Sequence, residues 1–210
     1  DTLRSRGLGD VYKRQVITGF GRTGQWFASQ TMELEPDMMA LAKGLTSGYV
    51  PMSAVMVGDR VANKLVADGG EFYHGFTYSG HPVAAAVALA NLELIEREDM
   101  ITRVREDTGP YLAEALAPLA EHRIVGEIRT FGVLAAIELV KSKDGPEMFE
   151  DTGATGVICR DHAINRGLMM RAVRDAMILS PALTYSRADI DETVRIAAQA
   201  LDATADQLGL

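Results

Sequence analysis

A strongly apolar helix, predicted from Pro82 to about Glu98, constrains the fold more than any other stretch of this chain. Proline early in the first turn favours a helix start. Residues 83–90 are VAAAVALA, which places small apolar side chains on nearly every side of the helix. Because such a helix buries more than one face, the sequence predicts that it packs against a sheet or against a second subunit.

Short apolar runs alternate with helical patterns in the first half of the chain. Residues 16–18 indicate the end of one strand, residues 38–42 a second, and residues 53–58 a buried third. Asp59 is a suitable cap for a helix that continues to Val66. This alternation predicts an α/β layer.

The chain changes character at residues 96–99, where four charged residues follow one another. We therefore predict a domain boundary there, with one domain over residues 16–98 and a smaller α+β domain over residues 99–210. The smaller domain is expected to contain a helical segment interrupted at Gly109, paired strands over 124–129 and 131–140, a helix over 155–165, short strands over 168–171 and 177–179, and a C-terminal helix. Ser186 and Asp189 have the spacing of a capping box for that last helix.

The charge balance excludes some classes of partner. The chain has 21 Lys and Arg against 29 Asp and Glu, a net charge of -8. It has no basic cluster that could neutralise a row of phosphates, so we expect no nucleic-acid partner. Its one cysteine, Cys159, cannot form an internal disulfide, and no apolar run is long enough for a membrane span. A cytoplasmic location is the expectation.

Residues 1–15 differ from the rest of the chain. They carry several basic residues and have neither helical nor strand periodicity. Residues 5–15 (SRGLGDVYKRQ) resemble a translated sequencing adapter joined to a genuine coding sequence near Val16. We therefore expect a non-native head and leave it out of the fold prediction.

A single lysine, Lys43, follows the apolar run of residues 38–42 and opens a glycine-bracketed loop, KGLTSG. An amine at the end of a buried strand is partly desolvated, which favours its neutral form and makes it a candidate Schiff-base nucleophile. The alternative is that Lys43 is merely solvated, as lysines at strand ends commonly are.

Two glycine-containing loops lie on either side of Lys43. Residues 19–24 (GFGRTG) match the dinucleotide fingerprint, but a short, proline-interrupted segment follows instead of a long helix, so this match is weak. Residues 72–82 (FYHGFTYSGHP) combine aromatic rings, glycines and hydroxyls before a helix. The Thr77 hydroxyl and the free N–H groups there are suited to a phosphate, although Thr77 and Ser79 could equally serve only to start the helix.

From Val16 to about Ala203 the chain resembles the class III, pyridoxal-phosphate-dependent aminotransferases, most closely the branch that acts on putrescine and other ω-amines with pyruvate. The resemblance rests on three motifs in order: VITGFGRTG at 16–24, AKGLTSG at 42–48 and HGFTYSGHP at 74–82. It implies the α/β fold of type I, of which the chain would contain the C-terminal part of the large domain and the small C-terminal domain.

The resemblance also implies roles for individual residues. Lys43 is expected to hold pyridoxal 5'-phosphate as a Schiff base and to move the proton during transamination. Thr77 is expected to reach the cofactor phosphate of a neighbouring subunit, which implies a homodimer or a dimer of dimers. Arg171 matches the family's arginine for the 2-oxo acid carboxylate, with Arg174 as an alternate and a plain surface arginine as the other interpretation.

The chain departs from the family pattern just before the first motif. The family carries an Asp-Glu pair where this chain has Arg14 and Gln15, and the aspartate of that pair binds the cofactor's pyridine nitrogen. A cation there opposes protonation of that nitrogen. The family's first half, with its phosphate loop and stacking aromatic, is absent as well. We therefore expect the chain as written not to catalyse the reaction.

Several rival functions stay open at this point. A mutase or decarboxylase would use the same fold, an NAD(P)-dependent oxidoreductase would use the loop at 19–24, and a non-catalytic fragment would bind no cofactor. Metal binding has little support, because Cys159 and His162 have no second ligand pair at a suitable spacing.

Overall fold

The computed structural model describes residues 12–69, 72–144 and 147–210, and it divides into two compact units, Asp1–Ile101 and Thr102–Leu210. The division falls within the short helix α4 (Met100–Arg103), close to the predicted boundary after Glu98. The assignment of residues 1–15 to a non-native head stays a prediction, and residues 1–11 lie outside the described part.

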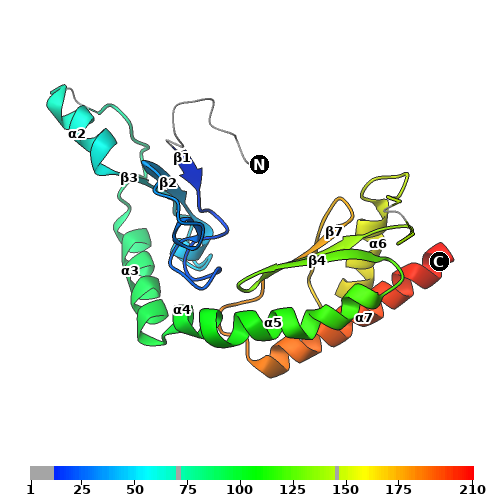
Figure 1. The fold of residues 1–210 in the computed structure, drawn as a ribbon. Helices are drawn as coiled ribbons and strands as arrows, with labels where there is room; N and C mark the ends of the chain where they lie inside the picture. Colours follow the sequence, from blue (N-terminus) through cyan, green and yellow to red (C-terminus); the bar gives the residue numbers. More distant parts are fainter. Residues whose placement is uncertain (1–11, 70–71, 145–146) are drawn as a thin grey trace. The chain divides into compact units, whose positions relative to one another are not determined.

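The first unit contains a three-stranded sheet of order β1-β2-β3 (Figure 1). Strand β1 is parallel to β2, and β2 is antiparallel to β3. Its elements are β1 (Tyr12–Arg14), α1 (Ala28–Thr31), β2 (Met38–Leu41), the 3-10 turn η1 (Lys43–Leu45), β3 (Ala54–Val57), α2 (Asp59–Ala67) and α3 (Pro82–Arg97).

The first strand lies earlier than predicted. Residues 16–18 form a turn, and the strand is Tyr12–Arg14, inside the segment expected to be irregular. The backbone of Gln15 continues the pairing, since its N–H donates to the Ala40 carbonyl at 2.9 Å. The buried Gln15 side chain accepts the Ala28 N–H at 2.9 Å, so Gln15 is an integral part of the fold.

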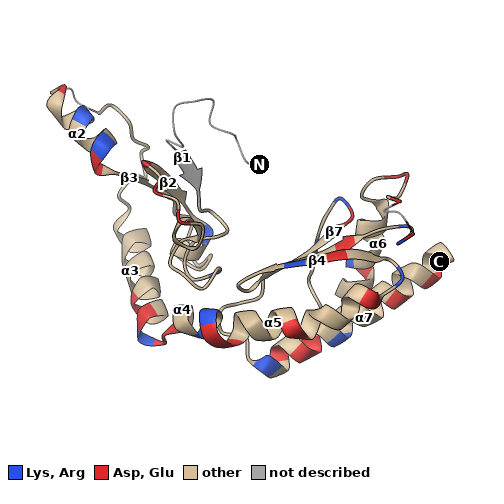
Figure 2. Cartoon of the chain, viewed as in Figure 1, with Lys and Arg blue, Asp and Glu red and all other residues tan. Residues whose placement is uncertain are grey.

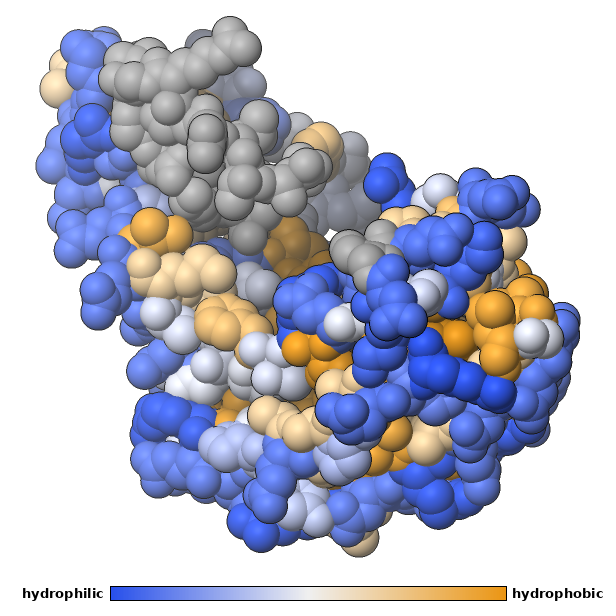
Figure 3. Space-filling view, turned by 45° about the vertical axis from the view of Figure 1, so that its right-hand side comes forward, coloured by the Kyte–Doolittle hydropathy of each residue, from blue (hydrophilic) through white to orange (hydrophobic). Residues whose placement is uncertain are grey.

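One prediction about burial in this unit is wrong, and the packing of α3 against a second subunit stays a prediction. In β3, Val55, Met56 and Val57 are exposed, although a buried strand was predicted. In α3 only one stripe is buried, at Ala84, Ala88 and Ile95, while Val83 and Leu89 remain 60% and 61% exposed. Helix α2 begins after Gly58, which makes no side-chain cap, rather than being capped by Asp59. The unit therefore presents apolar surface, and orange hydrophobic residues interrupt the mostly blue surface in Figure 3.

The second unit is a four-stranded antiparallel sheet of order β4-β5-β7-β6, with helices packed against it. In Figure 1, α5 and α7 lie side by side, and α6 also packs on α7. The elements from α4 onward are the π-helical η2 (Val104–Thr108), α5 (Gly109–Leu116), the 3-10 turn η3 (Ala117–Glu121), β4 (Val125–Phe131), β5 (Leu134–Leu139), α6 (Ala154–Ile164), β6 (Arg171–Val173), β7 (Ala176–Leu179) and α7 (Arg187–Leu208).

Alternation along β5 places Ala135, Ile137 and Leu139 in the core of this unit, to which Ala197 and Leu201 of α7 also belong. Acidic residues recur along α7 (Figure 2). The predicted capping box of α7 is present: Ser186 Oγ accepts the Asp189 N–H, and Asp189 accepts the Ser186 N–H.

Candidate active site

The turn that carries Lys43 follows directly from β2. Ala42 is extended, and Lys43 then has φ +47°, a left-handed conformation that is uncommon for a residue with a side chain. The Lys43 carbonyl accepts the Thr46 N–H at 3.2 Å, and the buried Thr46 hydroxyl donates to the Val50 carbonyl at 2.7 Å. Strain of this kind persists only where surrounding contacts hold it, and it is concentrated at functional sites.

The amine environment differs from the expectation. Lys43 is exposed, so the predicted partial desolvation is wrong for this chain. The physical reason is that β2 is poorly covered: of its four residues only Leu41 is buried, and Met38, Met39 and Ala40 are half-buried. The Nζ of Lys43 is therefore accessible to a ligand from solvent.

The loop of residues 19–24, the first glycine motif, packs beneath the turn at Lys43–Thr46, which we call the lysine turn. Phe20 is buried, has φ +59° and meets Phe27 edge to face. A Cβ at Gly44 would lie 2.9 Å from Phe20 Cδ2 and 3.0 Å from Phe20 Cβ, so only glycine allows this approach. The motif is followed by the four-residue helix α1 rather than by the long helix that a dinucleotide fingerprint requires. Its role here is to support Gly44.

Asn91 of α3 also holds the lysine turn, and it was not among the predicted residues. Its Nδ2 donates to the Gly44 carbonyl at 2.8 Å and to the Leu45 carbonyl at 3.1 Å. Its Oδ1 accepts the Ser47 hydroxyl at 2.6 Å. The signal available in the sequence was a single amide within a helix whose first half is apolar.

The loop around Thr77 begins α3. Thr77 is exposed at the start of a turn in which Ser79 Oγ accepts the Phe76 N–H at 2.8 Å. The helix cap is neither Thr77 nor Ser79 but His81, whose Nδ1 accepts the Ala84 N–H at 3.4 Å. The Thr77 hydroxyl therefore has no part in capping the helix.

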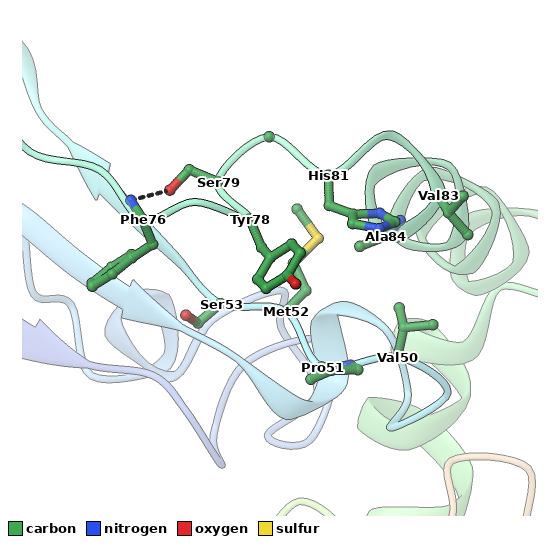
Figure 4. A pocket seen from close by; sticks show the side chains of 11 residues that line it. Val50, Pro51, Met52, Ser53, Phe76, Tyr78, Ser79, His81, Val83 and Ala84 are labelled. Atoms are coloured by element: carbon green, nitrogen blue, oxygen red, sulfur yellow. Dashed lines mark hydrogen bonds between the residues drawn. The ribbon is translucent and has the colours of Figure 1, made fainter.

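A cavity of about 500 Å³ lies between residues 50–53 and the beginning of α3. Figure 4 shows the Tyr78 ring and the Met52 side chain between these segments, with Ser53 and His81 at the sides of the cavity. Its lining is mostly apolar, and it includes neither Lys43 nor Thr77. The cavity therefore borders the Thr77 loop without joining the two predicted cofactor residues.

Arg171 lies in the second unit, so its position relative to Lys43 and Thr77 stays a prediction. It is the exposed first residue of β6 and pairs with Ile178 of β7. Arg174, the alternate, is in the hairpin turn with φ +54°. The buried Asp175 fixes this hairpin, because its carboxylate accepts the Gly153 N–H at 2.9 Å and the Gly156 N–H at 3.0 Å at the start of α6.

The structure also shows the surroundings of Cys159 and His162, which were considered as metal ligands, and of Arg22. Cys159 is fully buried in the second unit, and burial raises the pKa of its thiol to about 11. His162 contacts Gln207 at 2.8 Å. Burial lowers the pKa of Arg22 in the first glycine motif. Among the described residues, no group of three or more His, Cys, Asp or Glu could hold a metal ion, and no helix is long and apolar enough to cross a membrane.

Comparison with known proteins places these motifs in a family. Residues 15–201 match the family described as aminotransferase class-III. The chain is 52% identical to the putrescine–pyruvate aminotransferase of Pseudomonas aeruginosa over 191 residues, which are 91% of the chain and 41% of that protein. It is 40% identical to the diaminobutyrate–2-oxoglutarate transaminase of Halomonas elongata, over 92% of the chain and 42% of that protein.

Solved structures agree with the sequence matches. The omega transaminase from Pseudomonas jessenii in complex with PMP superimposes with a TM-score of 0.88 at 39% identity, covering 94% of the chain and 44% of that structure. The chain thus spans less than half the length of these relatives. The neighbours confirm the predicted fold class, α/β of fold type I. Given a family match over nearly its whole length, the chain belongs to the class III aminotransferases.

Proposed function

We propose that this sequence carries the lysine half of an aminotransferase that moves an amino group from an ω-amine or diamine, such as putrescine, to pyruvate or a related 2-oxo acid. The observation that carries the proposal is the lysine turn: an accessible amine on a left-handed residue, held by Gly44 against Phe20 and by Asn91. The names of the relatives, which include putrescine–pyruvate aminotransferase, support the substrate class.

The residues present fit two ends of pyridoxal 5'-phosphate, the cofactor of class III aminotransferases. A primary amine on a fixed turn suits its aldehyde, and the exposed Thr77 hydroxyl, which takes no part in capping α3, suits its phosphate. When bound, this cofactor supplies the electron sink for bond breaking at the substrate carbon. We propose Lys43 as its ligand within one subunit and Thr77 as the residue with which each subunit binds the cofactor phosphate of its neighbour.

Lys43 has two tasks in this proposal. Its Nζ would hold the cofactor in the resting protein, and it would carry a proton from the substrate carbon to the cofactor during the reaction. Both tasks need an amine without its proton. The Lys43 side chain is exposed in this chain, so its amine is accessible to a cofactor and a substrate.

Arg171 is proposed to bind the carboxylate of the 2-oxo acid as a two-pronged donor. Its position at the start of β6, next to a hairpin fixed by Asp175, gives it a stable backbone while its side chain remains free to swing. An uncharged or cationic amine would displace the guanidinium rather than pair with it.

A homodimer or a dimer of dimers is proposed as the working assembly. The support is the apolar surface of the Thr77 loop, where Phe76 and Tyr78 are 76% and 80% exposed, and of α3, where Val83 and Leu89 are exposed. Phe76, Tyr78 and Val83 line one cavity, and exposed apolar surface of this kind is typical of a protein interface. A cytoplasmic location stays a prediction.

Arg14 is proposed to lower activity in the chain as written. Its backbone pairs with Ala40 of β2, so position 14 lies on the strand beside the one that leads to Lys43. A guanidinium in place of the family's aspartate does not suit a protonated pyridine nitrogen. The present residues thus fit the aldehyde and phosphate ends of the cofactor, but not its nitrogen.

The test uses a graft, in which residues 12–201 replace the matching part of the Pseudomonas aeruginosa aminotransferase. The graft is made with Arg14 and with Arg14→Asp. We expect the Arg14→Asp graft to show the absorbance band of lysine-bound cofactor and to form alanine from pyruvate and putrescine, and the Arg14 graft to form far less alanine. A Lys43→Ala graft should lose both signals. A band that persists without Lys43 would refute the assignment.

The same assay separates the rivals. A mutase or decarboxylase would consume the amine without forming alanine. A non-catalytic protein would show neither the band nor amine consumption. Alanine formation that depends on added amine supports transamination alone.

A further inference from the structure

Asn91 lies on the buried face of α3, in register with Ala84, Ala88 and Ile95. These residues recur at helical spacing, so their side chains point the same way. A half-buried amide in this stripe needs hydrogen-bond partners, and here the lysine turn supplies them.

The three contacts of Asn91 all meet the chain just after Lys43. Two N–H groups reach the carbonyls of the residues immediately after Lys43, at 2.8 and 3.1 Å, and the Oδ1 accepts from Ser47 at 2.6 Å. A backbone in an uncommon conformation at Lys43 keeps it only if its neighbours are fixed. Asn91 fixes the peptide groups that contain the Gly44 and Leu45 carbonyls.

The same helix carries the Thr77 loop at its beginning. Asn91 is nine residues beyond Pro82, about 14 Å along a helix axis at 1.5 Å per residue. One rigid element therefore connects the turn of the proposed Schiff-base lysine with the proposed phosphate ligand.

We propose that Asn91 is a positioning residue, which sets the direction of the Lys43 side chain by holding the Gly44 and Leu45 carbonyls and which fixes that turn relative to the Thr77 loop. This inference rests on the proposed role of Lys43. It predicts that loss of the amide harms cofactor attachment and proton transfer while the rest of the protein remains folded.

The main variant is Asn91→Ala, because alanine favours the helix and removes all three contacts without adding charge. Asn91→Asp is nearly isosteric, but it replaces two donors by an acceptor that faces two carbonyls. Ser47→Ala removes only the contact to Oδ1. Asn63→Ala is the matched control, the same substitution at an exposed residue of α2 in the same unit.

The first measurement uses the 210-residue chain and does not need the cofactor. Amide hydrogen exchange is followed at Leu45 and Thr46, whose N–H groups close the turn to Ala42 and Lys43. Asn91→Ala should speed exchange at both by about tenfold, as expected for the loss of about one net hydrogen bond in a local opening, whereas Asn63→Ala should not. Unchanged exchange at both amides would overturn the proposal.

The second measurement uses the Arg14→Asp graft. Asn91→Ala should lower kcat by about tenfold to a hundredfold, the cost of misplacing a reacting group by about 1 Å, and should shift the pH midpoint of the lysine-bound cofactor band. Asn91→Asp should be at least as impaired, and Ser47→Ala should stay within about twofold because both carbonyl contacts remain. A faster-exchanging turn with normal kcat and a normal pH midpoint would overturn the positioning role.

The outcomes separate this inference from the proposed function. If the band survives Lys43→Ala, the function of Lys43 is wrong, and with it the positioning role, even if exchange shows that Asn91 holds the turn. If the band depends on Lys43 but Asn91→Ala changes neither kcat nor the pH midpoint, the function stands and the role of Asn91 is wrong.

Discussion

The Asp175 carboxylate is the most sharply testable structural element of the second unit. It is only 2% exposed, and each of its oxygens accepts one backbone N–H at the start of α6, from Gly153 and from Gly156. Hydrogen bonds to a charged acceptor contribute about 1.5–3 kcal/mol each, and a buried N–H left without a partner costs about 1–3 kcal/mol. The Gly156 bond is buried and the Gly153 bond is partly accessible to water, so the second loses less.

We therefore expect Asp175→Ala to lower the free energy of unfolding of this unit by about 3–5 kcal/mol. Asp175→Asn keeps one acceptor oxygen and turns an NH₂ towards the other donor, so its loss should be about half as large. The assay is native-state hydrogen exchange at the Val140 amide, which donates to the Ile124 carbonyl at 2.9 Å inside the second unit.

Asp151→Ala is the matched control, since Asp151 is an exposed acidic residue just before the same helix. It should change stability by no more than about 0.5 kcal/mol. A loss below about 1 kcal/mol for Asp175→Ala would refute the idea that this carboxylate holds the hairpin to α6.

Three further predictions concern other parts of the molecule. Gly44→Ala brings a Cβ to 2.9 Å from buried Phe20, so urea denaturation should show a loss of about 1–3 kcal/mol for the first unit, and an unchanged midpoint would mean that Phe20 moves freely. Cys159, whose pKa is raised to about 11, should resist thiol reagents at neutral pH until the chain unfolds, and rapid labelling of the folded chain would contradict its burial. Its contribution to stability is complete below the unfolded pKa near 9.0 and is lost as pH rises through about 11. Hydrogen bonds from Ser186 lower the pKa of Asp189, so this contribution to stability is present above the ordinary value near 3.8 and is lost as pH falls through the lowered pKa; thermal unfolding of Asp189→Asn should lack that part of the acid dependence, and identical acid profiles would contradict it.

Local sequence signals were sufficient where one element is determined by its own residues. The capping box at Ser186 and the periodic face of α7 predicted that helix well, and β4 and β5 overlap the paired strands predicted over residues 124–129 and 131–140. Helix α3 begins at Pro82 as predicted. The starts of both helices involve neighbours within a few residues, whereas β4 and β5 also depend on their pairing with each other and with β7.

Predictions failed where burial depends on distant surfaces. The apolar run of β3 suggested a buried strand, yet Val55 and Met56 are exposed, because hydrophobicity alone does not say what covers a face. The helical segment near Gly109 was expected to break, but it continues through the π-helical residues 104–108, which keep Val104 and Thr108 buried. Strand Tyr12–Arg14 has no periodic signal and depends on its pairing with β2.

In the candidate site, too, the sequence identified some residues and could not identify others whose roles depend on distant contacts. Lys43 and the two flanking motifs could be found from residue types and order. Asn91 could not be tied to the lysine, because its contacts with Gly44, Leu45 and Ser47 span more than forty positions of the sequence. The exposure of Lys43 could not be predicted either, since it is a property of everything that surrounds the turn.

Lys43 is proposed to be the residue to which the cofactor attaches. The most direct measurement is borohydride reduction of the Arg14→Asp graft loaded with pyridoxal 5'-phosphate, which fixes the cofactor to its lysine, followed by mass spectrometry of the peptides. We predict that the added mass lies on Lys43 and is absent from that peptide in the Lys43→Ala graft. Modification of another lysine in its place, or of none, would contradict the claim.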